Sequence, residues 1–326
     1  MDFDRIISKI LISFLLVLNV SVCIIGQSGY VTGRISDEKD KAPLPYAHIY
    51  VKGKPIGVYS NEVGKFKLRH LTLGDTFIVT SIGYQEKEIR YEQESIGEIL
   101  LNPKSYELVS AEIRTGNPKD YEYGFMTDRI NTKKISGVAY GIGVEQKEEK
   151  LILTNYQMAV QIRNEKNLSG TIKSVEIYLH EAGVEWAPFR LRLYNCKESN
   201  TPGDDLINEN IILSGEKGDW IKVDLEKYYL ELPERGFFIS IEWLPTSDKE
   251  YWYPIDKKLQ LSKKVWRKWK KVFKANTEST LGYGHMIGVY DSASKNEVWR
   301  KSVNKEWEKK YFEYSPMIKC KVRIWE

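Results

Sequence analysis

The chain has 326 residues, of which 42% are hydrophobic and 29% charged, values that exclude wholesale disorder, a collagen-like repeat and a polytopic membrane protein. Its formal net charge of +4 is too small to indicate nucleic-acid binding on its own. The 21 tyrosines and 9 tryptophans favour half-buried strands and supply flat faces for ligands or partners.

The N-terminus, residues 1–26, has the layout of a secretory signal peptide. Arg5 and Lys9 precede an apolar run over residues 10–25, and polar residues follow Gly26. Because the run is shorter than the ~20 residues that span a bilayer comfortably, we expect cleavage after Gly26 rather than an uncleaved anchor. No later segment is apolar enough to cross a membrane. The protein is therefore predicted to be exported, to the periplasm, the outer-membrane surface or the medium.

Residues 27–102 are predicted to form a small β-sandwich. Runs of strand-forming residues alternate with turn residues at intervals of roughly ten positions, and each run is too short for a helix. The expected strands are residues 31–35, 47–52, 65–68, 76–81 and 86–91.

Four motifs in this region resemble the carboxypeptidase regulatory-like domain, a transthyretin-like module of exported Bacteroidota proteins. The motifs are Gly33-x-Ile35-x-Asp37, Pro43-Leu44-Pro45-x-Ala47-x-Ile49-x-Val51-x-Gly53, Gly57-x-x-Ser60-Asn61-x-x-Gly64-x-Phe66 and Ser81-Ile82-Gly83-Tyr84. The glycines allow tight turns, and Phe66 and Tyr84 supply core bulk. The resemblance implies a transthyretin-like sandwich but no activity, because fold does not fix function.

Residues 103–150 are polar and turn-rich, and we interpret them as a linker and the irregular start of a second domain. Residues 151–326 alternate apolar and polar residues again, so each strand should have one dry and one wet face, as in 190–193 and 220–225. This half resembles uncharacterised C-terminal halves of exported Bacteroidota proteins. The predicted fold class is all-β: a transthyretin-like sandwich followed by a larger antiparallel, jelly-roll-like sandwich.

Two cysteines remain once the signal peptide is removed. Cys320 shares the strand face of Val322 and Ile324, so it should point into the core. Cys196 shares the face of the arginines at 190 and 192 and should point outward. Bridging requires Cβ atoms that face each other, so two free thiols are favoured over a disulfide.

The sequence contains no recognisable catalytic motif. None of the histidines has zinc-protease spacing, and no Gly-x-Ser-x-Gly segment is present, so neither a metal nor another cofactor is predicted. The histidines are His48, His70, His180 and His285. Carboxylates from distant strands could still meet in a cleft. Glu242, Glu181 and Asp224 are the possible members of such a pair.

Two groups of residues are candidate binding surfaces. Aromatic residues gather near a strand end, where they could stack on sugar rings or a protein partner, or simply plug the sandwich; they are Trp243, Tyr251, Trp252 and Tyr253. A basic segment with interleaved aromatic residues, 257–274, could contact an anionic surface if helical, or form a solvated edge. Its predicted contact residues are Lys263, Lys264, Arg267, Lys268, Lys270 and Lys271.

Taken together, these features predict a non-enzymatic cell-envelope or surface protein that binds a glycan or a protein partner. The alternative is a glycan-acting hydrolase of the envelope with an unrecognised carboxylate site. Export separates the protein from nucleic acid, so no nucleic-acid partner is expected.

Overall fold

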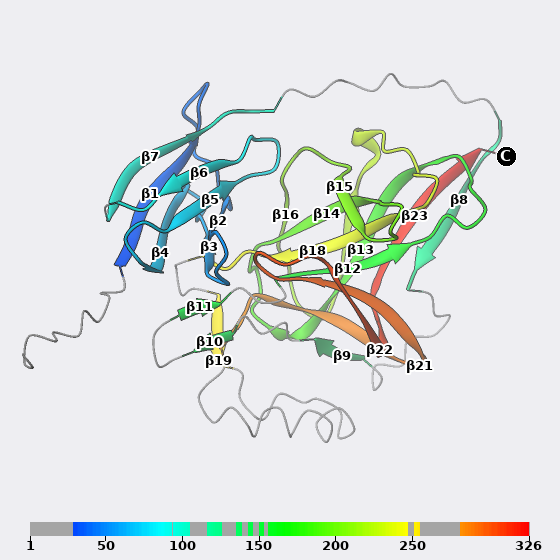
Figure 1. Cartoon of the computed structure of the whole chain (residues 1–326). Coiled ribbons are helices and arrows are strands. Elements are labelled where there is room, and N and C mark those ends of the chain that lie inside the picture. Colours follow the sequence, from blue (N-terminus) through cyan, green and yellow to red (C-terminus); the bar gives the residue numbers. More distant parts are fainter. Residues whose placement is uncertain are drawn as a thin grey trace, which may run out of the picture.

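The computed structural model describes residues 29–92, 94–104, 116–125, 135–138, 143–145, 150–152, 156–246, 251–254 and 281–325. Over these residues the chain is all-β, as predicted, with one short 3-10 helix, η2 (Glu226–Tyr228). Figure 1 shows a smaller first domain, blue to cyan, beside a larger second domain, green to red. The predicted signal peptide lies outside the described residues.

The first domain is a sandwich of two sheets. Its strands are β1 (Gly29–Asp37), β2 (His48–Val51), β3 (Gly57–Tyr59), β4 (Lys65–Leu71), β5 (Thr76–Thr80), β6 (Lys87–Arg90) and β7 (Ser95–Leu101). One sheet has the order β4-β1-β7 and the other the order β3-β2-β5-β6. β1 and β7 run parallel, whereas the remaining paired strands are antiparallel.

Alternating side chains of both sheets meet in the core of the first domain. Phe66 is 3% exposed, as predicted, and Tyr84 is partly buried against the same core. Gly64 sits in the left-handed region with φ of +75°, and a Cβ there would lie 2.5 Å from the backbone oxygen of Ile35. A glycine is therefore required at this turn. The sequence predicts five of the seven strands and misses β3 and β7.

The second domain is built on a sheet of twelve strands. They are β8 (Pro118–Gly124), β9 (Ile135–Val138), β12 (Gln157–Ile162), β13 (Gly170–Gly183), β14 (Phe189–Cys196), β15 (Pro202–Asp205), β16 (Ile211–Leu213), β17 (Trp220–Asp224), β18 (Phe237–Trp243), β21 (His285–Lys301), β22 (Glu308–Pro316) and β23 (Ile318–Trp325). Two separate ribbons pair β10 (Gly143–Glu145) with β11 (Lys150–Ile152) and β19 (Trp252–Pro254) with β20 (Leu281–Tyr283).

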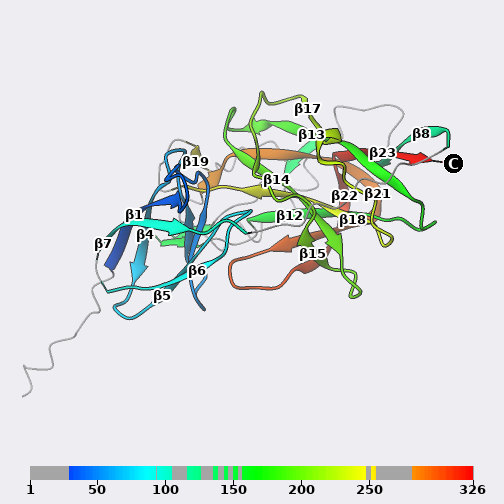
Figure 2. The same cartoon turned by 90° about the horizontal axis from the view of Figure 1, so that it is seen from above.

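The large sheet folds over on itself to enclose a core, which makes the domain a sandwich. Its main path runs β15-β14-β18-β12-β21-β13-β23-β8. Buried residues of β12, β14 and β18 belong to the same core cluster as those of β13, β17 and β23. Figure 2 shows β13, β17 and β23 lying above β12 and β18. In this core Cys320 is 2% exposed, while Cys196 is partly exposed, and both are free thiols as predicted.

The segment predicted as a linker and the irregular start of the second domain contributes two strands to the large sheet. β8 pairs with β23 along its whole length, from Pro118 opposite Trp325 to Gly124 opposite Lys319, and β9 pairs with β21. The prediction of an irregular segment over 103–150 is therefore wrong for these two strands. The polar character of β8 has a physical reason, because it lies at the end of the sheet path, where most of its side chains are exposed.

The two domains contact each other directly through backbone and side chains. The backbone N–H of Tyr59 donates to the oxygen of Pro245 at 3.0 Å. Asn304 Nδ2 donates to the backbone oxygens of Val51 and Lys54 at 2.8 and 2.7 Å. The side chains of Tyr46 and Tyr59, both from the first domain, belong to the core cluster of the second. The interface between the domains is thus continuous with the hydrophobic core of the second domain.

Candidate functional site

Four strands of the second domain carry polar side chains on one face of the sheet. The register places Arg190 of β14 opposite Glu242 of β18, and Glu242 opposite Gln157 of β12. Gln157 lies in turn opposite Lys301 of β21. Because directly opposite residues point to the same side of a sheet, these four side chains form a row. The alternate residues of β12, β14 and β18 point into the core on the other side.

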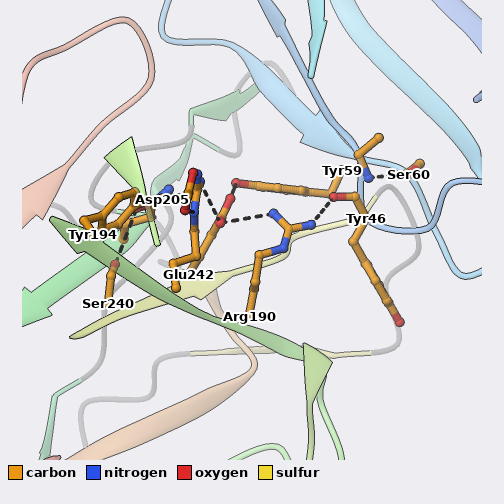
Figure 3. A network of polar contacts seen from close by, with 11 residues as sticks. Tyr46, Tyr59, Ser60, Arg190, Tyr194, Asp205, Ser240 and Glu242 are labelled. Atoms are coloured by element: carbon orange, nitrogen blue, oxygen red, sulfur yellow. Dashed lines mark hydrogen bonds and ion pairs between the residues drawn. The ribbon is translucent and has the colours of Figure 1, made fainter. Parts of the chain in front are cut away.

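A buried ion-pair network joins this row to the first domain (Figure 3). Glu242 Oε2 lies 3.1 Å from Arg190 Nη1 and 3.3 Å from Arg192 Nη1. The hydroxyl of Tyr59 donates to Glu242 Oε1 at 2.5 Å. Glu242 is 1% exposed and Arg190 is 2% exposed. Burial alone would raise the pKa of Glu242, but the two guanidiniums and the Tyr59 hydroxyl outweigh it and lower the pKa to about 2.

Further contacts hold both arginines in place. Arg190 Nη2 donates to the backbone oxygen of Tyr46, in the first domain, at 2.6 Å. Arg192 donates to both carboxylate oxygens of Asp205, from Nε at 2.9 Å and from Nη2 at 2.5 Å. Such two-point pairing fixes the plane of a guanidinium as well as its position. The arginines are therefore oriented before any ligand arrives.

His48 of β2 completes the first-domain side of the network. Its ring stacks on Tyr59, with centroids 4.6 Å apart and an interplanar angle of 10°, and lies 5.2 Å from the ring of Tyr156. It is 7% exposed, and Nε2 has no hydrogen-bond partner in the part of the chain that the structure describes. Burial lowers the pKa of His48 to about 3, although the nearby Glu242 acts in the opposite direction. The imidazole is therefore neutral at physiological pH.

A cleft of about 610 Å³ lies between the two domains, and Arg190, Arg192 and Glu242 of the network line it. The first domain contributes β2 and the residues that follow β5, and the second contributes β14, β18 and the turn after β21. Its walls carry both rings and polar groups. The aromatic lining residues are His48, Tyr50, Tyr84 and Tyr156.

The charge states of these groups decide what the cleft can do. Glu242 stays anionic and His48 neutral through the physiological range, because their pKa values lie near 2 and 3. Burial raises the pKa of Tyr59 and Tyr156 well above 10, so both hydroxyls stay protonated. Such groups are stable hydrogen-bonding partners rather than proton carriers. Among the described residues, no group of three or more His, Cys, Asp or Glu side chains could hold a metal ion.

The aromatic residues predicted from the sequence lie elsewhere. Trp243 is 1% exposed in the core, where Nε1 donates to the backbone oxygen of His285 at 2.7 Å. Tyr251 and Trp252 are partly buried and meet the ring of Tyr283 edge-on, at centroid distances of 6.3 and 5.2 Å. None of these residues lines the interdomain cleft. Trp243 therefore serves the core, while ligand binding by the other two stays a prediction.

Tyr253 lies in β19, but its side chain is not among those that the structure describes. The six basic residues predicted to contact an anionic surface, Lys263, Lys264, Arg267, Lys268, Lys270 and Lys271, also lie outside the described residues.

The three carboxylates that the sequence offers for a catalytic pair do not meet in the cleft. Glu242 lines the cleft, but Glu181 and Asp224 are exposed side chains that do not line it. Sequence reasoning missed Arg190, Arg192 and Tyr59 as members of the site. The sequence did contain one signal for this site. Two arginines lie two positions apart in the apolar strand β14, between Phe189, Leu191 and Leu193.

Solved structures match this chain only at low identity and low TM-score. The structure of BcpA, the major pilin subunit of Bacillus cereus, is 10% identical, with coverage of 90% of this chain and 69% of that one and a TM-score of 0.19. A structure of infectious bursal disease virus strain Gx is 9% identical, covering 91% and 63% with a TM-score of 0.21. A carbohydrate-binding module of the β-sandwich superfamily is 9% identical, covering 68% and 92% with a TM-score of 0.17. These scores are too low to support an inference about function.

No match was found among curated proteins. Within the described ranges, no helix has the length and apolar character needed to cross a bilayer. The family model of the CarboxypepD_reg-like domain matches residues 31–112, which contain all but the first two residues of the first sandwich. The N-terminal part of this chain is therefore a CarboxypepD_reg-like domain.

Proposed function

We propose that this chain is a non-enzymatic exported protein of the cell envelope or surface, and that it binds a glycan in the cleft between its two domains. The observation that carries the proposal is the cleft itself. Its walls combine flat rings with charged groups that are already paired and oriented. Both domains contribute to it, so the CarboxypepD_reg-like domain supplies part of the binding site.

The charge states favour binding over catalysis. General acid–base catalysis needs a group whose pKa lies near the working pH. Glu242, with a pKa of about 2, and His48, with a pKa of about 3, are both far from neutrality. The carboxylate of Glu242 is also engaged by two guanidiniums and a hydroxyl, which leaves it poorly placed to act as a nucleophile.

The size and lining of the cleft favour a sugar. Sites for small ligands usually enclose roughly 300–1,000 Å³, and the cleft of about 610 Å³ lies within that range. A sugar ring offers an apolar face to an aromatic ring and hydroxyl groups to planar polar side chains. Tyr50 is partly exposed at the cleft and offers such a face, while Arg192, Asp205 and Asn208 supply polar partners.

A glycan-binding experiment tests the proposal. The mature chain, residues 27–326, is screened against a panel of envelope and plant oligosaccharides, and affinities are measured by calorimetry. We expect Tyr50→Ala to weaken binding about two- to tenfold, since stacking on an aromatic ring is worth about 0.5–1.5 kcal/mol. The matched control is Tyr229→Ala, which removes a tyrosine 77% exposed outside the cleft and should bind like the wild type.

Two outcomes would contradict the proposal. Equal loss of affinity in both variants would show that the cleft is not the site. Release of new reducing ends during incubation would favour the hydrolase instead. Export is tested separately, by the mass of the protein recovered from cell fractions, which should begin at residue 27.

A further inference from the structure

Among the described residues that line the cleft, positive and negative charges do not balance. Deep in the cleft, the guanidiniums of Arg190 and Arg192 are neutralised by the carboxylates of Glu242 and Asp205. At its rim, two exposed lysines, Lys104 and Lys305, are equal in number to two exposed glutamates, Glu86 and Glu306. Lys301 remains as one additional positive charge among the lining residues.

Lys301 has no carboxylate within ion-pair distance among the described residues. It lies at the end of β21, in the same row as Gln157 and Glu242. Its ammonium group is 5.6 Å from the ring centroid of Trp307. Burial, and then the positive charge of Arg192, lower its pKa, whereas the more distant carboxylates of Glu242, Glu306 and Asp205 act in the opposite direction. A partly buried cation beside a second cation is costly unless a negative group joins it.

Three residues that line the cleft also carry buried polar atoms for which the described residues supply no hydrogen-bond partner. The atoms are His48 Nε2, Ser81 Oγ and Arg190 Nε. The Arg190 Nε and the Ser81 hydroxyl are donors, and a neutral imidazole can donate from Nε2. A buried donor without an acceptor is costly. Donor hydrogens carry partial positive charge, so these buried groups add to the positive charge beside the cleft.

We propose that the cleft selects an acidic glycan, in which a sugar bearing a single negative charge pairs with Lys301. This inference rests on the proposed function, because it specifies the class of glycan. Uronic acids and sulfate esters share the required chemistry, a monoanionic oxygen group on a sugar ring. Glu242 and Asp205 form their ion pairs with arginine and not with Lys301, so they offset the charge of Lys301 only in part.

Matched oligosaccharides test this inference. The mature chain is titrated with a neutral galactan fragment, with a galacturonate fragment of equal length and with a sulfated galactan fragment. We expect at least one acidic fragment to bind about tenfold more tightly than the neutral one, because charge-assisted hydrogen bonds are about twice as strong as neutral ones. The preferred acidic fragment identifies the anionic group. Raising the salt from about 50 to about 500 mM should reduce the preference.

Three variants assign the preference to Lys301. Lys301→Gln should lose the preference for acidic fragments, whereas Lys301→Arg should retain the preference. Lys222→Gln, which removes an exposed lysine of β17 outside the cleft, is the matched control and should behave like the wild type. Thermal unfolding of each variant shows whether it is folded.

The outcomes separate the two proposals. Equal affinity for acidic and neutral fragments, or an unchanged preference in Lys301→Gln, would overturn the inference while glycan binding stands. If no fragment bound to the folded wild-type protein, the proposed function would fail and the inference with it.

Discussion

Removing the hydroxyl group of Tyr59 tests whether the first domain is energetically coupled to the second. Tyr59 is fully buried, and its hydroxyl donates to Glu242 across the interface at 2.5 Å. A hydrogen bond to a charged group contributes about 1.5–3 kcal/mol. Glu242 keeps both arginine partners in Tyr59→Phe, so no charge is left unpaired. We therefore expect the free energy of unfolding to fall by about 2 kcal/mol, and the melting temperature by about 4–8 °C.

Tryptophan fluorescence makes the assay specific for coupling between the domains. All 9 tryptophans follow residue 185, so their signal reports the second domain, whereas Tyr59 belongs to the first. Urea unfolding followed by this signal should shift to lower denaturant in Tyr59→Phe. The matched control is Tyr50→Phe, which removes a partly exposed first-domain hydroxyl and should change little. An unchanged tryptophan midpoint in Tyr59→Phe would refute the coupling.

Two further predictions concern stability. Folding lowers the pKa of His48 from 6.5 to about 3. The contribution of this residue to stability is therefore present above pH 6.5 and is lost as the pH falls towards 3, at up to about 1.4 kcal/mol per pH unit. Urea midpoints measured across this range should fall less steeply in His48→Phe, and an unaltered slope would argue against a buried neutral imidazole. Gly64→Ala should destabilise the protein by at least about 2 kcal/mol in urea unfolding, because φ is +75° and the Cβ would approach the Ile35 oxygen to 2.5 Å. Gly53→Ala has the same φ but nothing within 4 Å, so an equal loss there would mean that crowding at Gly64 contributes nothing.

Alternation of apolar and polar residues was sufficient to predict most strands. In β17, Val223 is buried while Lys222 and Asp224 are exposed, as a half-buried strand requires. The pattern fails where a strand is covered on both faces or is polar throughout. β7 carries a glycine and a glutamate at its centre and pairs in parallel with β1, far away in sequence. No local pattern reports such a distant pairing.

The site illustrates a second limit, which concerns what lies over a predicted face. The sequence predicts that Arg190 and Arg192 point away from the core of their own domain, and they do. It also predicts that this face is wet, which is wrong because the first domain covers it and leaves Arg190 2% exposed. Periodicity along one strand gives the direction of a side chain but carries no information about a second domain that packs there.

Strand geometry also explains why Trp243 misled the search for a site. Consecutive residues of a strand point to opposite faces, so Glu242 and Trp243 cannot both line one surface. All seven residues of β18 are buried, and their apolar character does not reveal which face meets the core. Only the register with β14, which sets Glu242 opposite Arg190, identifies the polar face.

The buried charges at the interface point to a role other than stability, because buried ion pairs contribute little to the association of two domains. Desolvation offsets much of the attraction in a buried ion pair, and apolar residues of similar volume often stabilise as well or better. Arg190 and Glu242 nevertheless occupy central strands, where leucine or methionine would pack readily. A polar wall beside a cleft gives a reason for them that stability alone does not. The same residues fix the first domain through Tyr46 and Tyr59 and present oriented charges to whatever enters the cleft.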